Sequence, residues 1–167
     1  MTGDEMTALW EEHQRAEFEQ RDVERTLATM SADPHILNVP VMVGGRGREG
    51  VARFYRELFI PGIPADIEVV DFSATVGEGR IVAERNMAFT HDRVMPWILR
   101  GVEPTGRRVE VPHVVIVDFD RGKVHSEHIY WDQGSVLLQV GLLDGAAELP
   151  LVGADQARRL AEVAGSA

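Results

Sequence analysis

Apolar residues change their spacing near Asp66, and this change limits the folds that the sequence can adopt. In the first third they recur every three or four residues, as one buried side of a helix requires, beginning with Met6, Leu9 and Trp10. From Asp66 onward they alternate with polar residues, which is typical of strands with one buried face. The sequence therefore places helices before a sheet.

The helical part predicts three helices. The first begins near Asp4, and the second begins at Asp22 after a bend. The third carries Val51, Phe54, Tyr55 and Leu58 on its buried side and stops at the segment 61–64, which contains two prolines. Before this third helix, Asp33 and Pro34 predict a turn that is followed by short strands over residues 36–43 and a glycine-rich loop.

The alternating part predicts four long strands joined by turns that contain glycine, over residues 67–76, 80–94, 108–119 and 123–131. Helices followed by a meander of strands are typical of an α+β domain. We expect one curved antiparallel sheet wrapped round an N-terminal helical layer.

The length of 167 residues favours one domain over residues 1–167. After Asp132 helical spacing returns over residues 133–140 and 154–164. The apolar side chains of this region are too numerous to leave in water. We therefore expect residues 133–167 to form a C-terminal helical extension packed on the domain.

Charge and composition exclude several classes of partner. The net charge of -10 and the pI of about 5.0 leave nothing to attract nucleic acid or an anionic membrane. The chain has no cysteine, which excludes disulfides and thiolate chemistry and fits a reducing cytoplasm. No apolar run approaches the roughly 18 residues of a membrane span, and the first residues lack the pattern of a signal peptide. We expect a cytoplasmic protein with neither nucleic acid nor membrane as a partner.

The last two strands predict a hairpin whose register decides which side chains share a face. A three-residue loop at Asp120–Gly122 would place Val115 opposite Glu127 and His113 opposite Ile129. One face then carries Val111, His113, Val115, Glu127, Ile129 and Trp131. The other face carries Val114, Ile116, Val124, Ser126, His128 and Tyr130. Because both faces contain apolar residues and the helices cover one, we expect a homodimer through the other.

Several short blocks resemble the SnoaL-like polyketide cyclases of the nuclear transport factor 2-like superfamily, in the same order and over roughly residues 5–132. The blocks are Val51-Ala52-Arg53-Phe54-Tyr55, Phe89-Thr90-His91-Asp92, Gly101-Val102-Glu103-Pro104-Thr105-Gly106-Arg107, Gly122-Lys123-Val124 and Tyr130-Trp131-Asp132. The resemblance implies a cone-shaped sheet that encloses a pocket against the helices. It leaves the activity open, because the superfamily includes cyclases, isomerases, dehydratases, epoxide hydrolases and non-catalytic binders.

The resemblance also implies site residues. Polyketide cyclases of this type use a His and an acid on the last two strands, and His113 and Glu127 match them, with Glu where the family has Asp. Limonene-type epoxide hydrolases pair an Arg with an Asp that lies two positions later on the same central strand. Here Arg85 matches the Arg and Met87 replaces the Asp, so epoxide hydrolysis is set aside. The match supports Arg85, Met87, Phe89 and His91 as facing inward.

Three residues are candidates for catalysis. Glu127 on an apolar face can have a pKa raised toward the range of a general acid or base, or it can be a structural partner of Arg85 or a histidine. His113 and His91 can donate to an enolate oxygen or carry a proton, or they can be core histidines bound to a carbonyl group.

Five further residues are candidates for substrate binding: His13, Asn38, Tyr55, Arg85 and Trp131. Four of them have a structural alternative, which is a helix-to-sheet hydrogen bond for His13, a cap at a strand end for Asn38, and core packing for the two aromatic residues. No HxH or HExxH pattern is present, so we expect no metal and no cofactor.

Three hypotheses about function follow from these residues. The first is a cofactor-free enzyme that cyclises, isomerises or dehydrates a hydrophobic carbonyl compound by general acid–base chemistry. The second is a non-catalytic module that binds a hydrophobic small molecule with the same groups. The third is a dimerisation domain with a filled core.

Overall fold

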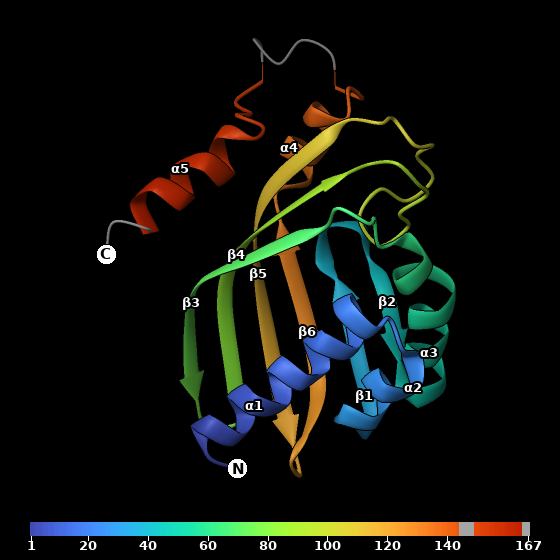
Figure 1. Cartoon of the computed structure of the whole chain (residues 1–167), viewed down its shortest axis with the longest axis vertical. Coiled ribbons are helices and arrows are strands. Elements are labelled where there is room, and N and C mark those ends of the chain that lie inside the picture. Colours follow the sequence, from blue (N-terminus) through green and yellow to red (C-terminus); the bar gives the residue numbers. More distant parts are fainter. Residues whose placement is uncertain (144–148, 165–167) are drawn as a thin grey trace.

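One six-stranded sheet, in the order β2-β1-β6-β5-β4-β3, organises the computed structural model, which describes residues 1–143 and 149–164. The helices α1 (Gly3–Gln14), α2 (Val23–Thr29) and α3 (Gly47–Arg53) lie on one side of this curved sheet (Figure 1). The α+β architecture with a curved sheet that the sequence predicted is confirmed. Among the described residues no helix is long and apolar enough to cross a membrane.

Both long helical segments end in π-helical turns. The segment η1 (Arg15–Gln20) continues α1, and η3 (Phe54–Phe59) continues α3 and runs into the 3-10 turn η4 (Ile60–Gly62). The predicted second helix begins after Asp22, whose side chain accepts hydrogen bonds from the backbone N–H groups of Glu24 and Arg25. The bend before it is set by Arg21, which adopts a left-handed conformation with φ of 52°.

The four long strands are β3 (Glu68–Gly77), β4 (Arg80–Thr90), β5 (Arg108–Asp120) and β6 (Lys123–Trp131). The sequence extended the second of these to residue 94, which is wrong. The chain leaves the sheet at Thr90, because the backbone of His91 bonds to that of Gly106 and Arg107 and closes a loop. This loop buries Met95, Trp97, Ile98 and Leu99, so it forms part of the core.

The strand β1 (Met30–Asn38) pairs parallel with β6 and antiparallel with β2 (Val43–Arg46), so the sheet is mixed and not entirely antiparallel. The turn predicted at Asp33 and Pro34 is wrong, since β1 runs through both residues. The register of β1 against β6 shifts between Met30 and His35. Such an irregularity accommodates proline, which has no N–H to donate to the ladder.

The register of the β5–β6 hairpin differs from the prediction by two residues. The loop has two residues, Arg121 and Gly122, which both have positive φ, and Asp120 pairs with Lys123. His113 lies opposite Trp131 and Val117 opposite Glu127.

An even shift keeps each side chain on its predicted face, so His113 and Glu127 still share one. The ladder is irregular next to the loop, where Val124 pairs with Phe119 but Ser126 pairs with Asp118. His125 is the additional residue of this bulge. Val124 is consequently buried in the core, and its predicted place on the outer face is wrong.

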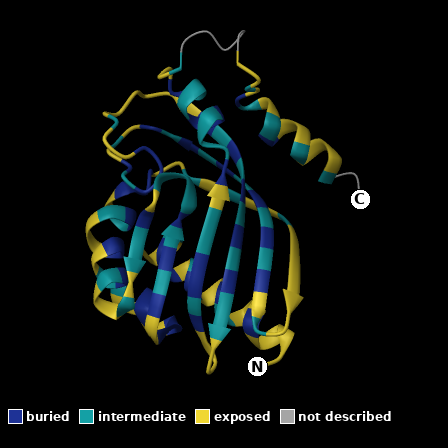
Figure 2. Cartoon of the chain, turned by 180° about the vertical axis from the view of Figure 1, so that it is seen from behind, coloured by how far each residue is buried: buried dark blue, intermediate teal, exposed yellow. Residues whose placement is uncertain are grey.

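The sheet alternates between buried and partly exposed residues along its strands (Figure 2). The C-terminal helix α5 (Asp155–Ala164) contacts outward-facing residues at one end of this sheet. Asn86 donates a hydrogen bond of 2.7 Å to the carbonyl oxygen of Ala157, and Arg158 lies 3.7 Å from the carboxylate of Glu110. Part of the face that the sequence left for a second subunit is thus covered by the chain itself.

The helix α4 (Gln133–Gln139) follows β6 and is capped by Asp132, which accepts from the backbone N–H of Ser135. The side chain of Gln139 bonds to both the N–H and the carbonyl group of Glu110, where β5 extends beyond β6. Residues 144–148 and 165–167 of the predicted extension lie outside the described residues. The single-domain organisation over residues 1–167 stays a prediction.

Candidate functional site

A cavity of about 60 Å³ lies between the helical layer and the sheet. Six of the fifteen residues that line it are aromatic: Trp10, Phe18, Phe54, Phe59, Trp97 and Trp131. Five polar side chains reach it: Glu17, Asn38, Arg85, His113 and Glu127. A mostly apolar cavity with a few converging polar groups is the usual form of a small-molecule site.

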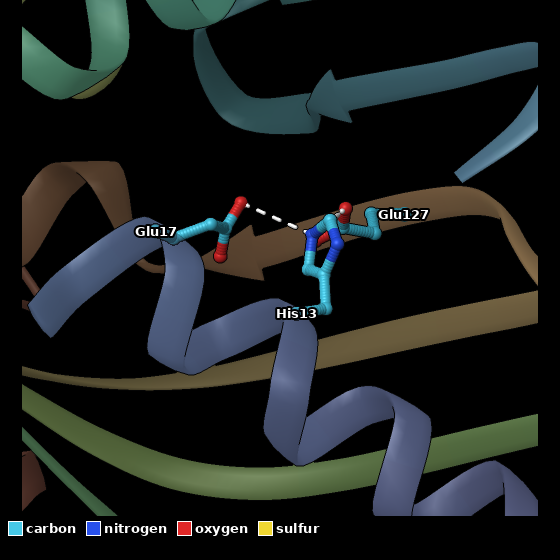
Figure 3. A group of neighbouring side chains, drawn as sticks. All are labelled: His13, Glu17 and Glu127. Carbon is cyan, nitrogen blue, oxygen red and sulfur yellow. Dashed lines mark ion pairs between the residues drawn. The ribbon is translucent and has the colours of Figure 1, made fainter. Parts of the chain in front are cut away.

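Four buried side chains meet beside this cavity, and two of them, Glu17 and Glu127, also line it. The Nε2 atom of His13 lies 3.0 Å from Oε1 of Glu127 and 3.2 Å from Oε1 of Glu17 (Figure 3). The hydroxyl of Tyr55 donates to Oε1 of Glu17 over 2.6 Å and lies 3.4 Å from Oε1 of Glu127. We call His13, Glu17, Tyr55 and Glu127 the buried cluster.

The helices explain why these side chains converge. His13 and Glu17 are four residues apart, where α1 passes into η1, and therefore point to the same side. Glu127 comes from β6 on the face that the helices cover, and Tyr55 stands in η3. Two cluster residues thus belong to π-helical turns, a rare conformation that is frequent at functional sites.

Hydrogen bonds fix where the protons of His13 lie. The hydroxyl of Thr29 donates its one proton to the carbonyl oxygen of Thr26 over 2.6 Å. The same hydroxyl oxygen lies 2.6 Å from Nδ1 of His13, so in this second hydrogen bond it is the acceptor. Nδ1 therefore carries a proton, and Nε2 faces the two carboxylates. Burial disfavours the imidazolium, but the charges of Glu17 and Glu127 outweigh it and raise the pKa of His13 to about 10.

Glu127 and Tyr55 also hold their protons more tightly than in water. Burial raises the pKa of Glu127; the charge of His13 opposes this effect, and the charge of Glu17 adds to it. Burial, together with the charges of both carboxylates, raises the pKa of Tyr55 well above its ordinary value. Tyr55 is therefore a neutral hydrogen-bond donor at all ordinary pH values.

The remaining polar groups of the cavity are Asn38, Arg85 and, beside Arg85 in the sheet, His113. Its imidazole is neutral, because burial and then the charge of Arg85, its neighbour on β4, lower its pKa to about 3. Nδ1 of His113 and Nδ2 of Asn38 are buried and have no hydrogen-bond partner among the described residues. Both residues line the cavity, so these atoms are available to a bound molecule.

Arg85 is largely committed to its neighbours. It bonds to Asp71 over 2.5 Å and to Gln14 over 2.6 Å, and its guanidinium lies 5.9 Å from the ring centre of Trp10. Its side chain is only 4% exposed. The sequence alternative of a Glu127–Arg85 ion pair is not what the structure shows, since Glu127 pairs with His13 instead.

The structure brings together most, but not all, of the candidate residues. Five of them line the cavity: Asn38, Arg85, His113, Glu127 and Trp131. His13 and Tyr55 bond to Glu127 in the buried cluster. His91 is not among the residues that line the cavity. Its Nδ1 accepts from the backbone N–H of Thr105, which holds the loop that follows β4.

Sequence reasoning missed Glu17. The signal that was available is its position four residues after His13, on the apolar side of the same helical segment. Trp97 was missed too, because the segment between β4 and β5 has no regular spacing from which burial can be predicted.

The same cluster contains the one group of metal-ligand type among the described residues. The ligand atoms of His13, Glu17 and Glu127 lie within 4.8 Å of one another, and imidazole with carboxylates suits several divalent ions. A metal would have to displace the proton on Nε2 of His13. The expectation of a site without metal or cofactor stays a prediction.

Comparison with known proteins extends the picture of the fold. TsrD from Streptomyces laurentii has 19% identity and a TM-score of 0.67, with 86% of this chain and 99% of that chain covered. A candidate SnoaL-like polyketide cyclase from Jannaschia sp. CCS1 has 20% identity and a TM-score of 0.64, with 82% and 94% covered. AclR, a candidate hydroxylase from Streptomyces galilaeus, has 21% identity and a TM-score of 0.64, with 85% and 99% covered.

At these identities the solved structures show a shared fold and do not show a shared reaction. No curated protein matches the chain. The model of the SnoaL-like domain matches residues 10–127, which is more than half of the sequence and includes most of the cavity residues. The resemblance found in the sequence is thereby confirmed, and the chain belongs to the SnoaL-like domain family.

Proposed function

We propose that the chain binds a hydrophobic carbonyl compound in this cavity and moves a proton on it without a cofactor, in a cyclisation, isomerisation or dehydration. The observation that carries the proposal is the pairing of Glu127 with His13 beside a cavity with aromatic side chains in its wall. A carboxylate in this position can act as a general base in water-poor surroundings.

The other polar groups complete a proton-transfer scheme. Glu127 removes a proton from the carbon next to a carbonyl group, and negative charge develops on the carbonyl oxygen. Nδ2 of Asn38 donates a hydrogen bond to this oxygen, and the neutral His113 acts as a second donor from β5. The aromatic walls exclude water from the charged intermediate.

The narrow cavity favours a compact or flat substrate. A volume of about 60 Å³ is small beside the several hundred Å³ of common ligand sites. A larger molecule would have to displace aromatic side chains such as Trp97, which stands in the loop between β4 and β5.

A non-catalytic binding module is the second candidate. The Nδ2 atom of Asn38, which has no hydrogen-bond partner among the described residues, favours it equally, because this atom can orient a ligand without any reaction.

We further propose that the protein is a cytoplasmic homodimer. The outward-facing side chains of Val114, Ile116 and Tyr130 support the dimer, and the absence of cysteine supports the compartment.

Exchange of carbon-bound hydrogen tests the catalytic proposal without knowledge of the substrate. A panel of β-diketones and β-ketoesters in deuterated water, followed by NMR, should show exchange accelerated by the wild-type protein and not by Glu127→Gln. Ligands retained on purification would be identified in parallel by mass spectrometry. Binding of panel members with equal exchange by both proteins would favour the non-catalytic module.

A further inference from the structure

The buried cluster contains two carboxylates but only one group that can carry a positive charge. Glu17 and Glu127 are 4% exposed, His13 is fully buried, and all three meet at Nε2 of His13. In the proposed function only Glu127 reacts. The second carboxylate therefore needs an explanation, because an unbalanced charge in such a site costs several kcal/mol.

The hydrogen bonds assign different states to the two carboxylates. Tyr55 has one hydroxyl proton to donate, and its hydroxyl oxygen lies 2.6 Å from Oε1 of Glu17 but 3.4 Å from Oε1 of Glu127. Glu17 is therefore the fixed anion that Tyr55 stabilises. Glu127 has the shorter distance to Nε2 of His13, at 3.0 Å. One further proton is needed between these two atoms, because a lone pair on Nε2 would otherwise face two anionic oxygens.

The position of this proton decides what Glu127 can do. If the proton is on His13, Glu127 is an anion beside a cation and is ready to act as a base. If it is on Glu127, the carboxyl group is an acid that cannot accept a proton. The other cation that reaches the cavity, Arg85, is bound to Asp71 and Gln14, so it does not balance Glu127.

We propose that Glu17 is a positioning residue of the site, which holds the shared proton on His13 and so keeps Glu127 ionised for catalysis. Tyr55 supports this role by fixing the carboxylate of Glu17 next to Nε2. Thr29 supports it from the opposite side, because its bond to Thr26 requires a proton on Nδ1 of His13. The inference rests on the proposed function only in the part that concerns turnover.

NMR of the His13 ring nitrogens tests the charge arrangement directly. In the wild-type protein both nitrogens should carry protons at pH 8, and titration should continue well above the ordinary range of histidine. A ring protonated at Nδ1 alone at pH 8 would overturn the proposal. This measurement needs no variant and no substrate.

Variants then separate Glu17 from a general effect of charge. Glu17→Gln keeps the size of the side chain and an oxygen for Tyr55 but removes the charge, so the pKa of His13 should fall by ~1–3 units. Glu19→Gln is the matched control, since Glu19 is exposed on the same π-helical turn. An equal pKa of His13 in Glu17→Gln and Glu19→Gln would refute the role of Glu17.

Turnover distinguishes this inference from the proposed function. If the wild-type protein accelerates deuterium exchange, Glu17→Gln should lower kcat by ~10-fold or more with little change in KM, because the shared proton then moves toward Glu127. A lowered pKa of His13 together with no exchange in the wild type would support the charge arrangement and count against the proposed function.

Discussion

Raising the pH should destabilise the folded protein through His13. The pKa of this histidine is about 10 in the folded chain against an ordinary value of 6.5. A group whose pKa is higher in the folded state contributes stability that is fully present below pH 6.5 and is lost as the pH rises through 10. Between these limits the free energy of unfolding should fall by ~1.4 kcal/mol per pH unit, toward an upper limit of ~5 kcal/mol.

The shared proton of the cluster adds no second contribution of this size. Glu127 also has a raised pKa, which has the same sign, but the two residues hold one proton between them, and it is counted once. The expected slope is therefore that of a single group.

Urea denaturation at a series of pH values between 6 and 9.5 measures this slope. His13→Gln cannot carry the charge, so its free energy of unfolding should be lower at pH 6.5 and should change much less over the same range. This comparison also removes every pH-dependent contribution that the two proteins share. Parallel curves for the wild type and His13→Gln would refute the assignment of a protonated, buried His13.

Three other outcomes follow from the structure. Glu127→Gln should lower the rate of deuterium exchange by ~10²–10⁴-fold with little loss of binding, and combining it with His113→Gln should cost less than the sum of both, as kinetics of the double variant would show. Light scattering at micromolar concentration should give a dimer mass for the wild type and a monomer mass for Ile116→Asp; a wild-type monomer would contradict the dimer. Truncation after Asp132 should lower solubility and the melting temperature, because it uncovers the core beneath Val136 and Val140; an unchanged melting curve would contradict this.

The sequence predicted the architecture where local spacing determines it. The four long strands and the helices around Trp10, Val51 and Gln133 follow from apolar periodicity and capping residues. The parallel pairing of β1 with β6 could not be predicted, because it joins segments about ninety residues apart and leaves no local signal in the sequence. The buried loop after Thr90 was missed for a related reason, since its burial depends on packing and not on spacing.

The outer face shows how tertiary packing limits a prediction made from patterns. The apolar residues of this face predict that it is covered, and a second subunit is the simplest cover that the pattern suggests. The helix α5 takes part of that role, because Asn86 and Glu110 contact its residues Ala157 and Arg158. A dimer interface, if it forms as proposed, has to use the part of the face that α5 leaves free, toward Ile116 and Tyr130.

The common face of His113 and Glu127 could be predicted in spite of an incorrect hairpin register, and the reason is geometric. The error was two residues, and side chains of a strand alternate with a period of two, so His113 and Glu127 kept their common face. The partners across the hairpin were nevertheless wrong, since Val117 and not Val115 lies opposite Glu127. The alternation of apolar and polar residues could not predict which helix faces β6. His13 and Glu17 reach Glu127 only because α1 crosses the sheet at this point, and the charge state on which the proposed chemistry depends is set by that contact.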